Sequence, residues 1–175
     1  MQHSNNQSKQ SPSLKARALR LLSKREYSRK ELSAKLKQQI KQNDLKNRES
    51  TDREKVALEQ IDTAAEIEAI LDDFAARGWQ SDERYAEALI RTKGQRYGQK
   101  KIMDDLERAG VDLDKANGLI EQLKNTELER AKVLWGRKFG MLASNLKEHQ
   151  KQYRFLLSKG FSADIVSKIV GRLGD

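Results

Sequence analysis

The feature that most constrains the fold of this chain is an internal repeat with a helical period. The segment "ALRLLSKREYSRKELSAKL" at 18–36 matches "AEALIRTKGQRYGQKKIMDDL" at 86–106 once a two-residue insertion is allowed. A shorter match joins "LERAGV" at 106–111 to "LLSKGF" at 156–161. Tandem helical units bury their apolar faces on themselves and on their neighbours. The matched positions of the longer pair are Ala18 and Ala86, Leu21 and Leu89, Leu22 and Ile90, Tyr27 and Tyr97, Lys30 and Lys100, Leu32 and Ile102, and Leu36 and Leu106.

Apolar residues recur at helical spacing throughout, and helix-ending glycines and N-cap residues divide them into three helices per unit. Gly78, Gly110 and Gly160 each follow an apolar stretch, so each is expected to end a helix. The third helix of the middle unit is expected to include both Leu113 and Leu123. The sequence therefore predicts an all-α fold, an elongated tandem of three three-helix, helix-turn-helix-like repeats. N-caps are expected at Ser162 and, as capping boxes, at Ser28 with Glu31, Thr51 with Glu54 and Thr126 with Glu129.

These signals also suggest where the units begin and end. We expect a disordered tail at 1–13, a first repeat at 14–79, a second at 80–125 and a third at 126–175. The first repeat contains a polar insertion near 37–60, whose early part, 37–50, is either a linker or a frayed helical extension. One long helix should follow from the cap at Thr51 and end at Gly78.

Composition argues against an enzyme. The chain has no cysteine, and its histidines, His3 and His149, are far apart, so the sequence offers no thiolate nucleophile and no ready metal site. The segment "GQRYGQKK" lacks the glycine spacing of a nucleotide-binding loop. We expect no catalytic residues, no cofactor and no metal. Without an apolar run long enough to span a membrane, the expectation is a cytoplasmic protein with no membrane contact, and a helical repeat of this size can be a monomer.

The charge pattern points to an acidic partner. Lys and Arg number 35 against 26 Asp and Glu, which gives a net charge of +9. Basic clusters recur at the first helix of each unit and the turn after it, whereas 62–73 is acidic. A solvated helix face explains any one cluster, but recurrence in three units favours a binding role. The candidate binding residues are Arg25, Arg29, Lys30, Arg91, Lys93, Arg96, Lys100, Lys101, Arg137 and Lys138.

Three aromatic residues admit two interpretations each. Tyr97 could stack on a nucleic-acid base, but Tyr27 occupies the matching place in the first unit, which favours packing. Trp79 and Trp135 are expected to be structural anchors, with contact to a partner as the alternative.

The segment "ARGWQSDERYAEALIRTKGQRYGQKKIMDDLERAGV" at 76–111 resembles the signature region of the RecX family, bacterial regulators of the RecA recombinase. The flanking segments "ALRLLSKREYSRKELSAKL" and "YRFLLSKGFSADIVSKIV" resemble the first and last repeats of that family. The resemblance covers nearly all of 14–173 and implies three-helix repeats. The stretch 37–60 departs from it, being longer than the family's usual connection.

The resemblance implies a non-enzymatic protein that binds the RecA filament and inhibits its ATPase, strand exchange and assembly, within homologous recombination, DNA repair and the SOS response. DNA would be contacted as part of the filament and bound weakly alone. The alternative is a direct DNA-binding protein that uses its basic repeats. A third hypothesis is an interaction scaffold that uses the acidic helix at 62–73.

Overall fold

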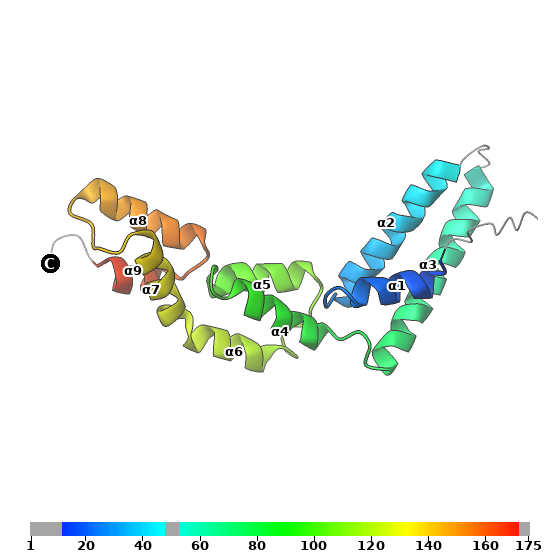
Figure 1. Ribbon diagram of the computed structural model, residues 1–175, viewed down its shortest axis with the longest axis horizontal. Helices are drawn as coiled ribbons and strands as arrows, with labels where there is room; N and C mark the ends of the chain where they lie inside the picture. Colours follow the sequence, from blue (N-terminus) through cyan, green and yellow to red (C-terminus); the bar gives the residue numbers. More distant parts are fainter. Residues whose placement is uncertain (1–11, 48–52, 172–175) are drawn as a thin grey trace, which may run out of the picture. The chain divides into compact units, whose positions relative to one another are not determined.

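The computed structural model describes residues 12–47 and 53–171. Within these ranges every regular element is an α-helix, which confirms the predicted all-α class (Figure 1). The chain divides into two compact units, at Met1–Gln80 and Ser81–Asp175. The described helices are α1 Leu14–Leu22, α2 Arg29–Asn47, α3 Arg53–Ala76, α4 Asp82–Lys93, α5 Gln99–Arg108, α6 Asn117–Asn125, α7 Glu127–Lys138, α8 Leu146–Ser158 and α9 Ala163–Val170.

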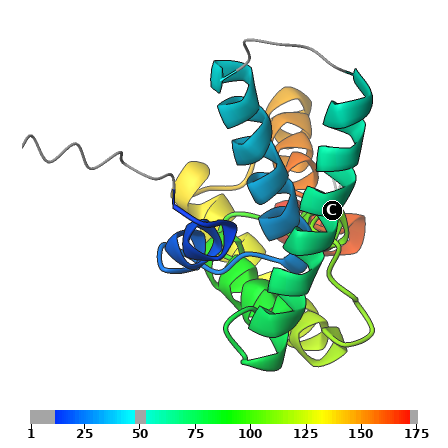
Figure 2. The same ribbon diagram turned by 90° about the vertical axis from the view of Figure 1, so that its right-hand side faces the viewer.

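The first unit consists of α1 packed against the pair α2 and α3 (Figure 2). Hydroxyl groups start its first two helices. The Ser13 hydroxyl accepts a hydrogen bond from the N–H of Ala16 at 3.2 Å, and the Ser28 hydroxyl accepts one from the N–H of Glu31 at 3.1 Å. The cap predicted at Ser28 is therefore confirmed, whereas Thr51 and most of the polar tail lie outside the described residues.

The core of the first unit is formed by the apolar faces that the helical period predicted. Leu32 and Leu36 of α2 and Leu71 and Phe74 of α3 are fully buried. Burying an apolar side chain of this size contributes about 1.5–3 kcal/mol, so these contacts are the main source of stability in the unit. The complete buried cluster is Ala18, Tyr27, Leu32, Leu36, Ile67, Ile70, Leu71 and Phe74.

The end of α3 is fixed by a glycine and a tryptophan. Gly78 has a φ of +67°, a conformation that favours glycine, and the N–H of Trp79 returns to the carbonyl of Phe74 at 2.8 Å. The Trp79 ring lies edge-on to the Phe74 ring, with centroids 5.3 Å apart. Trp79 therefore packs on the helix it follows, as predicted.

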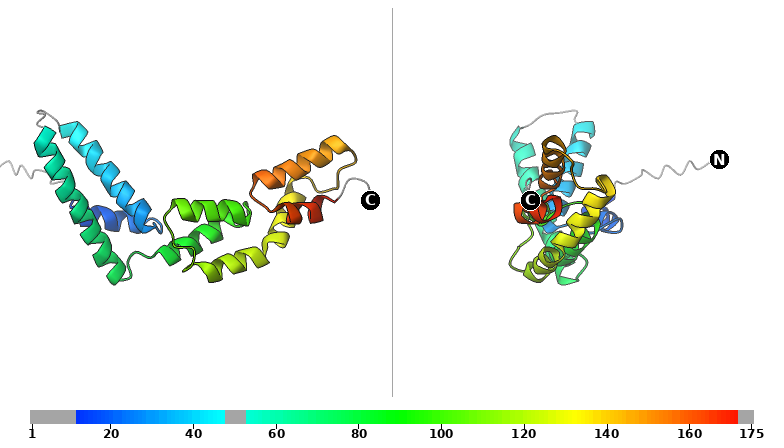
Figure 3. Two further views of the ribbon diagram at one scale, coloured as in Figure 1. Left: turned by 180° about the vertical axis from the view of Figure 1, so that it is seen from behind. Right: turned by 90° about the vertical axis from the view of Figure 1, so that its left-hand side faces the viewer.

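The pair α2 and α3 continues side by side beyond the part that meets α1 (Figure 3). The sequence left 37–50 as either a linker or a helical extension. The described part of it is a helical extension, since α2 continues to Asn47. Among the side chains that the structure describes between Leu36 and Ile67, none is fully buried. Lys- and Gln-rich sequence forms helix readily, so the pair can extend without a large core.

The second unit contains α4 to α9, and three of these helices are capped by the side chain of their own N-cap residue. Ser81, Asn145 and Ser162 accept hydrogen bonds from backbone N–H groups three residues further on, at 3.2, 2.9 and 3.4 Å. The cap predicted at Ser162 is confirmed. These caps satisfy N–H groups that have no partner within their own helix.

Two apolar cores lie within this unit, one in the middle bundle (α4–α6) and one in the last bundle (α7–α9). Tyr85, Ile102 and Leu106 lie at the centre of the first, while Leu156 and Val166 lie at the centre of the second. Trp135 packs against the last bundle's core and its Nε1–H donates to Gln152 Oε1 at 2.9 Å. Its predicted anchoring role is therefore confirmed.

Two local predictions in the second unit were wrong. Thr126 does not cap α7 with its side chain, because its hydroxyl donates back to the carbonyls of Gln122 at 3.0 Å and Leu123 at 3.2 Å. Helix α6 begins at Asn117, later than expected, and Leu113 lies in the preceding turn. In that turn the Asp112 carboxylate accepts the N–H of Asp114 at 3.1 Å, a local bond that competes with helix formation.

Candidate functional site

The basic segment at 91–101 spans the end of α4, a turn and the start of α5, and its cations have different environments. Arg91, Arg96 and Lys100 are exposed and make no ion pair with any described residue. Arg91 also lines a hollow of about 260 Å³ beside α6. These side chains can meet a partner without first breaking an internal ion pair.

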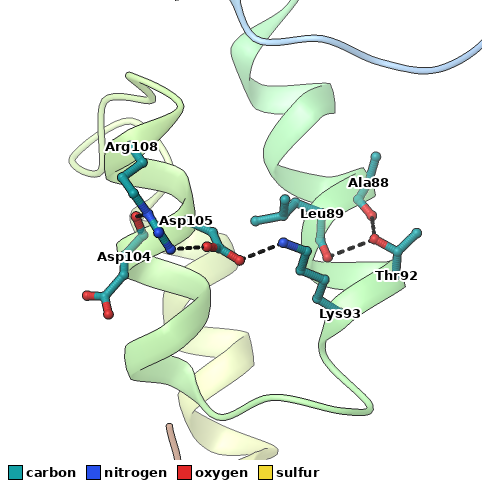
Figure 4. Close-up of polar contacts among 7 residues, drawn as sticks. All are labelled: Ala88, Leu89, Thr92, Lys93, Asp104, Asp105 and Arg108. Atoms are coloured by element: carbon teal, nitrogen blue, oxygen red, sulfur yellow. Dashed lines mark hydrogen bonds and ion pairs between the residues drawn. The ribbon is translucent and has the colours of Figure 1, made fainter. Parts of the chain in front are cut away.

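Lys93 is different, because it joins two helices. Figure 4 shows its ammonium reaching from α4 to the Asp105 carboxylate of α5, at 2.6 Å. Arg108 pairs with the same carboxylate. The hydroxyl of the neighbouring Thr92 donates to the Ala88 carbonyl at 2.8 Å and so lies against its own helix. Lys93 was predicted as a binding residue, and the structure places it in a contact within the middle bundle.

Tyr97 is half-buried and packs against the core of the middle bundle. The ammonium of Lys101 lies 5.1 Å from the centroid of its ring, and that of Lys159 lies 5.5 Å away. The packing interpretation of Tyr97 therefore fits the structure better than base stacking. Lys159 was not predicted, because it lies outside the basic clusters that the sequence shows at the first helix of each unit. Its place directly before the predicted stop at Gly160 was the available signal.

Arg130 of α7 holds the turn after α4 in place. Its Nη1 donates to the carbonyls of Gly94 at 2.6 Å and Tyr97 at 2.7 Å, and its Nη2 donates to Leu123 at 2.8 Å. Burial lowers the pKa of Arg130 below its ordinary value, and the charge of Glu127 partly opposes this shift. The guanidinium joins the two bundles of the second unit by three hydrogen bonds to main-chain oxygens.

A second residue of α7 acts on α5. Glu127 is only 5% exposed, and its carboxylate accepts the backbone N–H of Gln99 at 2.9 Å. The N-cap residue of α5 is Gly98, which has no side chain to do this. An acidic group at a helix N-terminus also interacts favourably with the helix dipole. The last bundle thus completes the start of a helix in the middle bundle.

In the first unit, two of the predicted binding residues are in internal ion pairs. Arg25 pairs with Glu31 at 3.0 Å and lies over the Tyr27 ring at 3.6 Å. Burial lowers the pKa of Arg25, but the hydrogen bond and the charge of Glu31 outweigh this effect, so the pKa is raised overall. Arg29 pairs with Glu68 and Asp72 of α3 at 2.8 Å each. The hydrogen bond to Glu68, above all, raises the pKa of Arg29.

Lys30 is exposed and forms no ion pair with the described residues of its unit. The acidic stretch at 62–73 also serves internal contacts, since Asp73 pairs with Lys15 at 2.7 Å and with Arg77. The separation of basic segments from the acidic stretch at 62–73 therefore reflects, in part, ion pairs that hold α1 and α2 to α3 within this unit. The scaffold hypothesis for the acidic helix loses part of its basis.

In the last bundle, Arg137 and Lys138 lie exposed in the final turn of α7, without ion pairs to described residues. Cations at this end of a helix interact favourably with its dipole. Across residues 12–47 and 53–171, no group of three His, Asp or Glu side chains could hold a metal ion. No helix in the same ranges has the length and apolar character needed to cross a membrane.

Known proteins match this chain along most of its length. The regulatory protein RecX of Ralstonia nicotianae is 36% identical over 162 residues, which cover 93% of this chain and 89% of that protein. The chain belongs to the RecX family. Regulatory protein RecX of Leptothrix cholodnii is 41% identical over 111 residues, or 63% of this chain and 70% of that protein. RecX of Chromobacterium violaceum is 33% identical and covers 90% of the chain.

Family models locate two RecX domains. The second RecX three-helix domain matches residues 81–117, and the third matches residues 125–170. A crystal structure of RecX from Lactobacillus salivarius superposes with a TM-score of 0.61 and 26% identity, covering 90% of this chain and 92% of that one. The relatives from Ralstonia, Leptothrix and Chromobacterium are named as regulatory proteins, which agrees with the expectation of a regulator.

Proposed function

We propose that this protein is a non-enzymatic regulator that binds the RecA nucleoprotein filament and inhibits its ATPase, strand exchange and assembly. The observation that carries the proposal is the match to a regulatory RecX protein over 93% of the chain. Exposed cations without internal ion pairs supply a surface for an acidic target. In the second unit these include Arg91, Arg96, Lys100, Arg137 and Lys138, beside the half-buried Lys101, and in the first unit Lys30.

The test is ATP hydrolysis by RecA on single-stranded DNA, titrated with this protein at fixed salt, beside DNA binding by the protein alone. We expect inhibition at concentrations where the protein barely binds naked DNA. No inhibition at amounts equal to RecA would contradict the proposal.

A second candidate function is direct DNA binding, favoured by the exposed cations of the α4–α5 turn. If this function is correct, the protein should inhibit the RecA ATPase only at concentrations where it also coats naked DNA, because competition for phosphates would then explain the inhibition. Such binding would fall steeply with added salt.

A combined variant tests the surface itself. Arg91, Arg96, Lys100 and Lys101 are changed to Gln, and Lys93 is kept because it pairs with Asp105. Exposed ionic contacts are worth about 0–1 kcal/mol each, so we expect inhibition to weaken on the order of tenfold or more in the combined variant. A matched control removes the same charge from exposed lysines elsewhere in the second unit, at Lys124, Lys147, Lys151 and Lys168. Equal effects in the two variants would assign the loss to net charge.

A further inference from the structure

The surface around Tyr97 combines cations from two bundles. Arg96, Lys100 and Lys101 belong to the α4–α5 turn and the first turn of α5, whereas Lys159 precedes Gly160 after α8. The ammonium groups of Lys101 and Lys159 lie 5.1 and 5.5 Å from the centroid of the Tyr97 ring. Arg96 and Lys100 adjoin Tyr97 and Lys101 along the chain, and we call these four cations the Tyr97 cluster: Arg96, Lys100, Lys101 and Lys159.

The backbone forces the two halves of the cluster together. The N–H of Gly98 donates to the Lys159 carbonyl at 2.9 Å. A Cβ on Gly98 would lie 2.2 Å from the Gly160 carbonyl oxygen, and a Cβ on Gly160 would lie 2.7 Å from the Lys101 Cβ. Only glycines permit this approach, and it fixes the main chain at both lysines.

The charge of the cluster is not neutralised by carboxylates within the part of the chain that the structure describes. None of the four side chains makes an ion pair there. The nearby Glu127 is buried, bonded to the Gln99 N–H and close enough to Arg130 to act on its charge. Like charges held close together repel, and the Tyr97 ring offsets only part of this repulsion. An anionic ligand would relieve the rest.

The surroundings favour phosphate over a protein partner. Protein interfaces usually have an apolar or aromatic centre. Of the exposed large apolar side chains that the structure describes, none lies in the turns at 94–98 and 159–161, although Leu157 is exposed nearby. The Tyr97 ring is covered by Lys101 and Lys159, and Lys159 also lies 5.6 Å from the Phe155 ring. Clustered Lys and Arg are typical of contacts to a nucleic-acid backbone, which carry no sequence information.

We propose that the Tyr97 cluster is a composite binding site for the backbone phosphates of nucleic acid, to which Lys101 and Lys159 contribute from different bundles. The inference rests on the proposed function, since it specifies which component of the RecA–DNA filament this surface meets. Its particular claim is that Lys159 acts together with the α4–α5 turn.

The test is binding of the whole protein, without RecA, to a labelled oligo-dT strand across a series of salt concentrations. The variants are Lys101→Gln, Lys159→Gln and, as the matched control, Lys151→Gln on an exposed position of α8. We expect the slope of log K against log salt to fall by about 0.7 in each of the first two, with a several-fold loss of affinity. The control should keep the slope of the unaltered protein, and circular dichroism should show equal helix content.

An unchanged slope for either Lys101→Gln or Lys159→Gln overturns the inference, as does an equal change in the control or an absence of binding even at about 50 mM salt. If these variants lose RecA inhibition but keep the slope, the cluster contacts protein, and the proposed function stands without the inference. If the slopes change as expected but the unaltered protein does not inhibit RecA, the inference stands and the proposed function fails.

Discussion

The guanidinium of Arg130 donates a hydrogen bond to the carbonyl of Tyr97 at 2.7 Å, across the junction between the middle and last bundles. The same side chain reaches Gly94 and Leu123, so one residue of α7 joins the ends of α4 and α6. The main chain of the basic turn is therefore positioned by the following bundle. A surface built in this way depends on contacts between bundles as well as on its own charges.

Replacing Arg130 should destabilise the second unit. Arg130→Ala removes a charged donor from three carbonyls, and we expect a loss of about 2 kcal/mol, measured by urea denaturation followed by circular dichroism. Arg130→Lys should also lose stability, because an ammonium cannot match the geometry of the guanidinium fork. The control is Arg137→Ala, an exposed change expected to stay within about 0.5 kcal/mol. Equal stability of the Arg130→Ala and Arg137→Ala proteins would contradict the assignment.

Gly98 should not tolerate a side chain. In Gly98→Ala the new Cβ would lie 2.2 Å from the Gly160 carbonyl oxygen, so the backbones must separate. We expect a loss of about 1–3 kcal/mol, as for other overpacked positions, and weaker RecA inhibition with an unchanged net charge. The matched control is Gly136→Ala in the interior of α7, where nothing lies within 4 Å of the added atom. That change should stabilise the helix by about 0.5–1 kcal/mol, and a similar gain at Gly98 would show that the close approach is absent in solution.

Asp73 should contribute a pH-dependent part of the stability of the first unit. Hydrogen bonds from Lys15 and Arg77 lower the pKa of Asp73 in the folded state. Since the unfolded pKa is about 3.9, the contribution is present above that pH and is lost as the pH falls through the lower folded value.

The measurement for Asp73 is the urea midpoint at pH 7 and at a series of values below about pH 4. The midpoint of Asp73→Asn should lie below that of the unaltered protein at pH 7 and approach it as the pH falls. Asp62→Asn serves as the control in the same helix, because Asp62 is exposed and has no ion pair with a described residue. A constant difference between the unaltered protein and Asp73→Asn would exclude the linkage.

The helices could be predicted because their cores depend on local period. Leu32 and Leu36, one turn apart, are buried together, and Ser28 and Ser162 cap the helices that follow them. Thr126 has the same local sequence signal, yet its hydroxyl finds a carbonyl acceptor in the preceding α6. The competing acceptor exists only because α6 ends immediately before α7, which the spacing of Thr126 and Glu129 does not reveal.

The candidate surface was only partly predictable, because counting charges along a segment does not identify their partners. Lys93 and Arg29 belong to basic segments, but their acids, Asp105 and Glu68, lie 12 and 39 residues away. Lys159 shows the opposite case, since a single lysine joins a cluster only when Gly98 and Gly160 bring two bundles together. Such assignments depend on tertiary contacts that no local pattern encodes.

Arg29 and Lys30 are neighbours in sequence for which the structure predicts different roles. Arg29 pairs with Glu68 and Asp72 at 2.8 Å each, whereas Lys30 is exposed and has no ion pair among the described residues. Arg29→Gln should therefore lower the stability of the first unit, by about 0.5–1 kcal/mol because the pairs are largely exposed, and leave RecA inhibition unchanged. Lys30→Gln should keep the stability and weaken inhibition by up to several-fold.

Urea denaturation and the RecA ATPase assay on the two single variants separate these roles, and a double-mutant cycle with Glu68→Gln measures the ion pair directly. We expect a coupling of about 0.5 kcal/mol between Arg29 and Glu68 and none between Lys30 and Glu68. If Arg29→Gln weakened inhibition while its stability and coupling stayed unchanged, the ion pairs would not form in solution. Arg29 would then be available to the filament, as its position in the basic segment first indicated.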